Sequence, residues 1–178
     1  MILRQTRPTQ EMAEVIFKAV DACREHLRPW CPWEKKDDSV ESCMKYLKEK
    51  VSKTESGERV EYGIFIKESN TYIGNIQVFD ISKENHHGEI GYWLVKDATG
   101  KGYMSEALKV LEKECFIGLK FHRIQLKCDA INKTSAKVIK SCGYTYEGML
   151  REDTYDEYRE RMSDTSIFSK LLNEYNEQ

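Results

Sequence analysis

Hydrophobic residues recur with the period of an α-helix in four stretches of the chain. Thr9 can cap the first stretch, which keeps this period until Pro29, and the second opens on a capping-box-like sequence at residues 38–41. The other two are predicted to be helices over residues 104–117 and 133–142. The apolar stripes are Met12, Val15, Ile16, Ala19, Val20, Cys23 and Leu27; Val40, Cys43, Met44, Leu47 and Val51; Ala107, Leu108, Leu111 and Cys115; and Ala136, Val138, Ile139 and Cys142.

Around these helices the pattern changes to the alternation of β-strands. Strands joined by short polar turns come before residue 97 and predict an antiparallel meander, whereas strands and helices alternate in the second half. Together they predict a mixed α/β sheet of about seven strands with flanking helices, folded as a single domain over residues 1–178. The expected strands cover residues 2–5, 61–67, 71–81, 88–96, 124–128, 144–150 and 163–172, and a polar loop is expected at residues 151–161.

Composition excludes several classes of function. With 28 Lys and Arg against 30 Asp and Glu, the formal net charge is -2, so we expect no direct nucleic-acid partner. The chain has no run of about 18 apolar residues and no secretory leader pattern, which predicts a cytoplasmic protein without a membrane attachment. The six cysteines are dispersed without zinc-site spacing, so they are interpreted as reduced core residues, and no metal is expected.

Two glycines one residue apart, Gly100 and Gly102, separate the apolar end of a predicted strand from the start of a predicted helix. The turn lacks the Gly-x-x-x-x-Gly-Lys-Ser/Thr spacing of a P-loop. It also departs from the dinucleotide-binding pattern Gly-x-Gly-x-x-Gly, because Ser105 occupies the third glycine position. The turn is then either an ordinary strand-to-helix connection or a short anion site, in which backbone N–H groups at a helix N-terminus collect around a pyrophosphate.

Three blocks of sequence are informative together: CREHLRPWCPW, EIGYWLVKDATGKGYMSEAL and HRIQLKCDAINKTSAKVIKSCGYTYEGMLRE. The second resembles the acetyl-CoA motif of the GNAT superfamily of N-acetyltransferases, and the third resembles the strand, helix and Gly-aromatic strand that follow it. The first is similar to the amino-terminal region of the ribosomal-protein (RimJ/RimL-like) branch. The resemblance covers nearly the whole chain and implies parallel strands that splay apart to form an acetyl-CoA groove.

The resemblance also implies roles for individual residues. Backbone groups at the end of the motif's strand would meet the pantetheine arm, and the glycine turn would hold the pyrophosphate. Asn132 would contact the cofactor further along, although it equally fits a plain helix N-cap. The implied acetyl-CoA-binding residues are Leu94, Val95, Gly100, Lys101, Gly102, Tyr103, Met104, Ser105 and Asn132.

The chain departs from the family pattern at two positions. Asp97 stands where the pattern has Gln or Arg, so the phosphate cradle would depend on backbone amides, with Lys101 beside them. Ile139 stands where many members carry the tyrosine that protonates the leaving thiolate, and the resemblance makes Ser135 the candidate donor instead. The missing tyrosine also keeps a non-catalytic acyl-CoA-binding module as an alternative.

Acetyl transfer to an amine requires a neutral nitrogen, a positioned thioester and stabilisation of developing charge. Direct attack is expected, because no cysteine has an evident His partner for a covalent acyl-enzyme. Glu89 is the predicted base, acting through water near the acetyl end of the implied groove, and a solvated strand-end charge is the alternative. His86 and His87 are further candidates that also fit a polar turn.

The acceptor is less constrained than the donor. An α-amine is ~10–15% neutral at pH ~7, whereas a lysine side chain is neutral to only ~0.04%, so a weak base suits an α-amine. We therefore expect a protein N-terminus, such as that of a ribosomal protein; a polyamine, an amino-acid-like compound or an aminoglycoside is the alternative. Trp30 and Trp33 would wall a peptide cleft or pin a loop to the core, and the acidic run at residues 152–160 would attract a cation or be solvated. A homodimer is compatible with these expectations.

Overall fold

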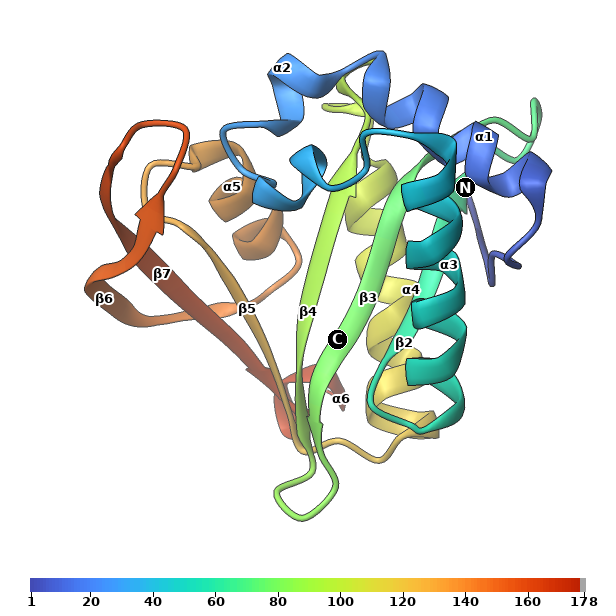
Figure 1. Ribbon diagram of the computed structural model, residues 1–178. Helices are drawn as coiled ribbons and strands as arrows, with labels where there is room; N and C mark the ends of the chain where they lie inside the picture. The colour runs from blue at the N-terminus through green and yellow to red at the C-terminus, as the bar shows by residue number, and fades with distance from the viewer. Residues whose placement is uncertain (177–178) are drawn as a thin grey trace.

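Residues 1–176, which the computed structural model describes, form a seven-stranded sheet with the strand order β1-β2-β3-β4-β5-β7-β6 (Figure 1). Neighbouring strands are antiparallel except β4 and β5, which run parallel. The predicted mixed α/β sheet with flanking helices is confirmed. The strands are β1 (Ile2–Arg4), β2 (Val60–Phe65), β3 (Tyr72–Ser82), β4 (His87–Leu94), β5 (Arg123–Asp129), β6 (Thr145–Asp156) and β7 (Arg161–Leu171). The helices are α1 (Gln10–Asp21), α2 (Arg24–Leu27), α3 (Val40–Glu55), α4 (Tyr103–Lys113), α5 (Lys133–Ser141) and α6 (Leu172–Asn176), with shorter turns η1 (Pro32–Lys35), η2 (Lys96–Ala98) and η3 (Glu114–Gly118).

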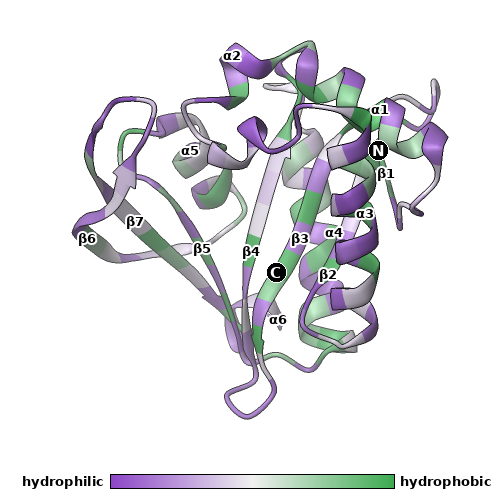
Figure 2. Cartoon of the chain, viewed as in Figure 1, coloured by the Kyte–Doolittle hydropathy of each residue, from purple (hydrophilic) through white to green (hydrophobic). Residues whose placement is uncertain are grey.

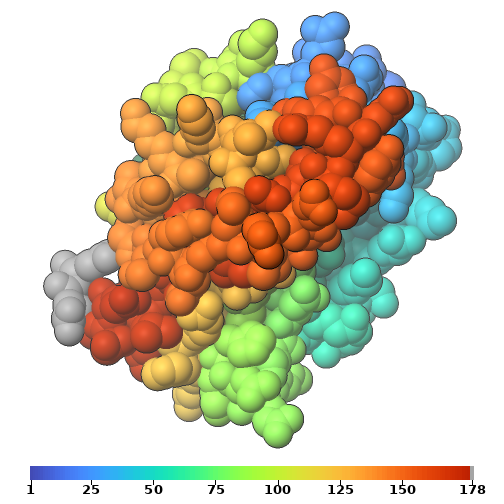
Figure 3. All heavy atoms as spheres, turned by 90° about the vertical axis from the view of Figure 1, so that its left-hand side faces the viewer, coloured from blue at the N-terminus to red at the C-terminus, as the bar shows by residue number. Residues whose placement is uncertain are grey.

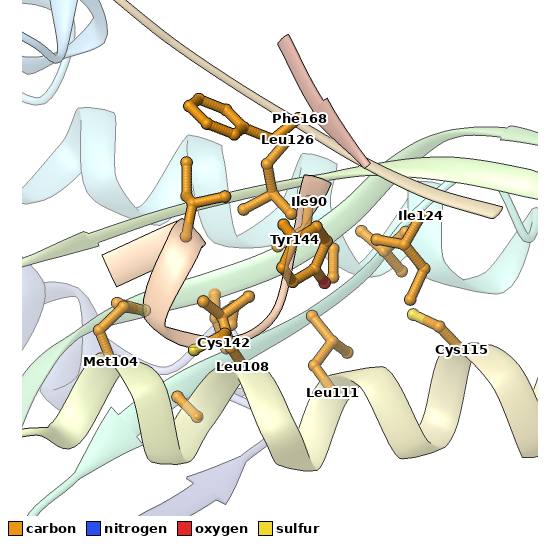
Figure 4. Packing of buried hydrophobic residues seen from close by; sticks show 14 of the residues in the cluster. Ile90, Met104, Leu108, Leu111, Cys115, Ile124, Leu126, Cys142, Tyr144 and Phe168 are labelled. Carbon is orange, nitrogen blue, oxygen red and sulfur yellow. The ribbon is translucent and has the colours of Figure 1, made fainter. Parts of the chain in front are cut away.

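Helices cover both faces of the sheet, and each face has a hydrophobic core. On one face α1 and α3 bury their apolar stripes, with Ile16 only 1% exposed. On the other face, α4 packs Leu108 and Leu111 against Ile90 and Leu126 of the two parallel strands (Figure 4). Burying one such side chain contributes about 1.5–3 kcal/mol. Figure 2 shows the contrast between these hydrophobic faces and the hydrophilic tip of the β6–β7 hairpin.

The parallel strands β4 and β5 separate part-way along their length. Their paired residues run from His87 with Arg123 to Ile90 with Leu126, although β4 continues to Leu94. Beyond the last pair the two strands diverge toward the end of the sheet where α2 lies (Figure 1). The predicted splaying of the parallel strands is therefore confirmed, and it leaves the far end of β4 with one edge unpaired.

The helix starts follow from capping side chains. Thr9 Oγ1 accepts the N–H of Met12 (3.2 Å), as predicted. The capping box of α3 starts one residue later than the predicted box at residues 38–41: Ser39 is the N-cap and exchanges hydrogen bonds with Ser42, so Asp38 and Glu41 do not form the pair. A serine hydroxyl can both donate and accept, and here it replaces the longer acidic side chain. The predicted helix over residues 104–117 also changes to a π-helical turn after residue 113.

The first predicted helix is wrong in its second half, because the chain breaks into α1 and α2. Cys23 leaves the helical conformation, with φ -138° and ψ 25°, two residues after Asp21. From the start of α2, Arg24 donates to the backbone carbonyls of Glu34 and Asp37, at 2.7 Å each. These long-range bonds hold α2 over the sheet and against the following loop.

The loop predicted at residues 151–161 is also wrong, because β6 runs on to Asp156 and pairs with β7. The last pair of the ladder is Asp156 with Arg161, so only a short turn remains. The pairing is irregular between Leu150 and Thr154, and Glu152 adopts a positive φ of 51°. Cross-strand hydrogen bonds outweigh the low strand propensity of Asp and Glu in this hairpin.

Candidate active site

A cavity of about 1260 Å³ lies where β4 and β5 diverge. Its walls come from segments far apart in the sequence: α2 and the loop after it, the end of β4, the turn before α4, the end of β5, α5, and the β6–β7 hairpin. Figure 3 shows the hairpin beside the N-terminal segment on this side of the molecule. A crevice outside the carboxyl ends of parallel strands is a common ligand site in α/β folds.

One end of the cavity is formed by the glycine turn and the start of α4. Gly100 and Gly102 both line it with positive φ angles of 73° and 81°, and a Cβ added at either position would meet no atom within 4 Å. The glycines are needed for the backbone conformation rather than by crowding. The first backbone N–H to bond within α4 is that of Glu106, which donates to the Gly102 carbonyl (3.0 Å). The N–H groups of Tyr103 and Ser105 come before it and have no partner within the helix.

Two cationic side chains of α5 line the same cavity. Lys133 and Lys137 are one helical turn apart on α5, and α5 lies beside the start of α4, where the Cys142 thiol is 4.0 Å from the Ser105 carbonyl. Lys101 is exposed on the turn and does not line the cavity. Free amides and lysines together form a site that fits a polyphosphate.

The end of β4 forms a second wall. The Val95 N–H bonds to the Ile73 carbonyl (2.9 Å), so this amide is used within the sheet. Successive peptide groups of an extended strand point to opposite edges. Leu94 therefore turns its own N–H and C=O toward the open side of the splay, and it lines the cavity.

Hydroxyl groups meet in the middle of the cavity, where α5 begins. Asn132 caps α5 by accepting the Ser135 N–H (3.0 Å). The Ser135 hydroxyl lies 2.9 Å from the Tyr92 hydroxyl, and both residues line the cavity. Burial raises the pKa of the Tyr92 phenol and of the Cys128 thiol, and the hydrogen bond with Ser135 partly offsets the shift of Tyr92. Ile139 is fully buried in the core.

Glu89 does not line the cavity, and its carboxylate lies in the paired part of the parallel strands. It forms an ion pair with Lys127 (2.9 Å) and accepts a hydrogen bond from Gln125 (3.2 Å). Lys127 does line the cavity, and Glu89 is the main cause of its raised pKa. His86 and His87 do not line the cavity; they belong to the turn and first residue of β4, at the opposite end of the strand.

The mouth of the cavity is bridged by contacts between the loop after α2 and the tip of the β6–β7 hairpin. The Arg159 guanidinium lies 4.7 Å from the ring centroid of Trp30 and donates to the Pro29 carbonyl (3.3 Å). Nearby, Lys35 pairs with Glu157 (3.0 Å). These contacts join two segments separated by more than a hundred residues at the mouth of the cavity.

The two tryptophans and the acidic run have distinct positions. Trp33 packs on Trp93, with ring centroids 5.3 Å apart, and so pins the loop to the core, whereas Trp30 lines the cavity. In the acidic run, Asp156 is paired with Arg159 and helps shape the hairpin tip. Asp153 also lines the cavity, and its charge contributes to the raised pKa of Lys127.

The cavity thus brings together most of the residues that the sequence singled out. Those that line it are Leu94, Gly100, Gly102, Tyr103, Met104, Ser105, Asn132 and Ser135; Glu89, Val95 and Lys101 lie outside its lining. Sequence reasoning missed Tyr92 and Arg159. Side chains alternate between the two faces of β4, so Tyr92 lies on the same face as Ile90 and Leu94, toward α5. This alternation is the sequence signal that could have identified Tyr92.

Within residues 1–176, no helix is long and apolar enough to cross a membrane. The same residues contain no group of three or more His, Cys, Asp or Glu side chains arranged to hold a metal ion. The six cysteines are free thiols.

The fold combines a seven-stranded mixed sheet, a splayed parallel pair and a glycine turn at a helix start, an arrangement typical of acetyltransferases. Residues 1–145 match the family model described as an acetyltransferase (GNAT) domain, and the chain belongs to this family. Among curated relatives, an uncharacterised N-acetyltransferase p20 of Bacillus licheniformis is 35% identical over 119 residues, which cover 67% of this chain and 66% of that protein. A ribosomal-protein-serine acetyltransferase of Escherichia coli (strain K12) is 30% identical over 105 residues, 56% of this chain and 55% of that protein.

The match thus spans less than two thirds of the length of these two relatives. Among solved structures, a ribosomal L7/L12 alpha-N-protein acetyltransferase in complex with coenzyme A superposes with a TM-score of 0.88 at 22% identity. That likeness covers 97% of this chain and 94% of the other chain, and it shows the shared fold.

Proposed function

We propose that this protein transfers an acetyl group from acetyl-CoA to an amine by direct attack, and that the amine is the N-terminal α-amine of a protein such as a ribosomal protein. The observation that carries the proposal is the continuity of one cavity, from the amides at the start of α4, along Leu94, to the Ser135 hydroxyl and the bridged mouth. Membership of the acetyltransferase family supports the donor.

The residues of the cavity fit acetyl-CoA in one direction. The amides from Gly100 to Ser105, with Lys133 and Lys137, would bind the phosphates. The free edge of β4 at Leu94 would hydrogen-bond the pantetheine amides as an added strand would. This orientation directs the thioester toward Ser135 and away from the phosphate end.

The proposed reaction forms a C–N bond and breaks the C–S bond. The amine nitrogen attacks the carbonyl carbon, and the electron pair of the C–S bond goes to sulfur. Ser135 donates a hydrogen bond to that sulfur as it departs. The proton lost by the nitrogen is taken up through water by Glu89, and the departing thiolate takes one proton from solvent, so the products are the amide and the free thiol of coenzyme A. The Glu89 carboxylate is ion-paired with Lys127 at 2.9 Å, and a carboxylate acting through water suits an amine that is already partly neutral.

Three features favour a protein N-terminus as acceptor. The α-amine, with a pKa of ~7.8, requires ~3.5 kcal/mol less than lysine for deprotonation. The part of the cavity that is lined by Trp30 and by residues 153–158 of the hairpin fits an extended chain end. One relative is named for acetylating ribosomal protein serine.

The proposal is tested with a panel of amines: short peptides with free or blocked N-termini, spermidine and an aminoglycoside, with coenzyme A release as readout. We expect acetylation of free α-nitrogens and little turnover of spermidine. Mass spectrometry of a bacterial proteome treated with the enzyme and labelled acetyl-CoA would then identify the acceptor. A strong preference for spermidine, falling steeply with ionic strength, would replace the protein acceptor by a small amine recruited by Asp153. Coenzyme A binding without release for any amine would indicate a non-catalytic module.

A further inference from the structure

The hydroxyl of Tyr92 contacts the proposed thiolate-binding hydroxyl and has no other hydrogen-bond partner among residues 1–176. Its oxygen lies 2.9 Å from Ser135 Oγ. Tyr92 comes from β4, whereas Ser135 comes from the first turn of α5, so the contact spans the splay between β4 and β5. The phenol therefore reaches the centre of the cavity from the wall opposite α5.

We infer that Tyr92 is a positioning residue for Ser135: it donates its proton to Ser135 Oγ and thereby leaves the serine proton free to point at the thioester sulfur. A serine hydroxyl has one proton and two lone pairs. When the phenol occupies one lone pair, the serine proton must be directed elsewhere. This inference rests on the proposed acetyl transfer.

Two contacts constrain Ser135. Asn132 fixes the Ser135 backbone through the 3.0 Å cap bond, and Tyr92 fixes the hydroxyl. Without the phenol, the serine hydroxyl is free to rotate, so fewer molecules present a proton to the substrate.

Burial keeps the phenol in the donor state. The pKa of Tyr92 is raised above its usual value by burial, so the hydroxyl stays protonated through the range in which an α-amine becomes neutral. Tyr92 therefore acts as a fixed donor and is not consumed in the reaction. The family's usual phenol is absent at Ile139, and here a phenol reaches the hydroxyl site from a strand instead.

The test compares Tyr92→Phe with a matched hydroxyl deletion elsewhere on the sheet. Tyr62→Phe also removes a half-buried hydroxyl that donates one bond, to Glu114 (2.8 Å), and it does not line the cavity. We expect Tyr92→Phe to lower kcat by roughly 5–10-fold, the size of one net hydrogen bond, with unchanged acetyl-CoA affinity, and Tyr62→Phe to leave kcat unchanged. In a Ser135→Ala background, Tyr92→Phe should cause no further loss.

A second readout does not depend on the acceptor. The thiol pKa of bound coenzyme A is measured from the ultraviolet absorbance of its thiolate, with desulfo-coenzyme A as the blank. A directed serine proton stabilises the thiolate, so Tyr92→Phe should raise this pKa by about 0.5–1 unit. An unchanged thiol pKa, or an equal loss of kcat in the presence and absence of Ser135, would overturn the inference.

If the proposed acetyl transfer is wrong, the experiments give a different result from the one expected if only the role of Tyr92 is wrong. A wild-type protein that binds coenzyme A but releases none from acetyl-CoA with any amine would disprove the transfer, while the thiol titration would still decide the role of Tyr92. A protein that binds no coenzyme A would refute both.

Discussion

The guanidinium of Arg159 lies 4.7 Å from the ring centroid of Trp30 and joins the hairpin tip to the loop after α2. A cation over an indole ring contributes about 0.5–2 kcal/mol, depending on its exposure. Arg159 is also paired with Asp156 and lies 3.9 Å from Asp129 at the end of β5. One side chain thus connects three segments around the cavity mouth.

Removing this connection should affect the acceptor more than the donor. Arg159→Ala is expected to raise the KM for a peptide acceptor by roughly 3–10-fold. Without this contact the loop after α2 and the hairpin tip are less ordered, and they must become ordered when the peptide binds. The KM for acetyl-CoA should stay unchanged, since the glycine turn lies at the other end. Steady-state kinetics check this, with the exposed neighbour Arg161→Ala as control. An equal rise in both KM values would show a general loss of structure.

The glycine turn gives a test of the phosphate site. Gly102→Ala places a methyl group in the space at the start of α4 and should weaken acetyl-CoA binding by more than 10-fold. Gly57→Ala is the matched control, because Gly57 has a similar φ of 76° and lies far from the cavity lining. Each substitution costs about 1–2 kcal/mol of folding stability for the left-handed conformation. Calorimetry that finds equal affinity in both folded variants would remove the glycine turn from the phosphate site.

Removing the Ser135 hydroxyl should lower the turnover number rather than the affinity for acetyl-CoA. Ser135→Ala is expected to lower kcat by roughly 10–1000-fold with little change in acetyl-CoA affinity, because the bond forms as the thiolate departs. Ser135→Thr keeps a hydroxyl and should recover part of the activity. Rapid-mix kinetics and calorimetry separate the two quantities. Full activity of the alanine variant would mean that water or a backbone group stabilises the departing thiolate instead.

The proposed base has a characteristic pH dependence. Glu89→Gln should reduce kcat/KM for a peptide by roughly 10–100-fold near neutral pH, and the loss should shrink as pH rises above the amine pKa of ~7.8, where the base is no longer needed. A pH profile of both proteins tests this. A loss that stays constant with pH would instead point to the ion pair with Lys127 as a structural contact.

A buried carboxyl near α3 predicts how stability varies with pH. Burial raises the pKa of Asp37, which is 9% exposed, from its usual 3.8 to about 6. The folded state then holds a proton that the unfolded state releases, so the stability contributed by the neutral carboxyl is present below pH ~4 and is lost as pH rises to ~6. The loss amounts to about 3 kcal/mol. In urea unfolding measured from pH ~4 to ~7, Asp37→Asn should remove this decrease in the free energy of unfolding with rising pH. If the free energies of unfolding of the two proteins instead fall in parallel, the assignment to Asp37 is contradicted.

Elements whose signals are local could be predicted from the amino-acid sequence. Thr9 as a cap, the apolar stripe of α4 and the glycine turn before it each depend on residues within a few positions of one another. The alternating strands, and the change from a meander to a β-α-β order, were sufficient to predict the mixed sheet. The sequence blocks likewise indicate the acetyltransferase family.

Features that depend on contacts between distant residues could not be predicted in this way. The break at Cys23 accompanies bonds from Arg24 to Glu34 and Asp37, and the extension of β6 depends on pairing with β7. Glu89 is ion-paired with a residue of the neighbouring parallel strand, although its own sequence context shows only a carboxylate at a strand start.

The cavity itself has the same origin. Tyr92 meets Ser135 across 43 residues of sequence, and Arg159 meets Trp30 from the other end of the chain. Local periodicity reports which face of an element is buried, but not which side chain lies opposite. The splay of β4 and β5 brings these pairs together, because it is set by how far the two strands remain hydrogen-bonded and by the helices packed on either side.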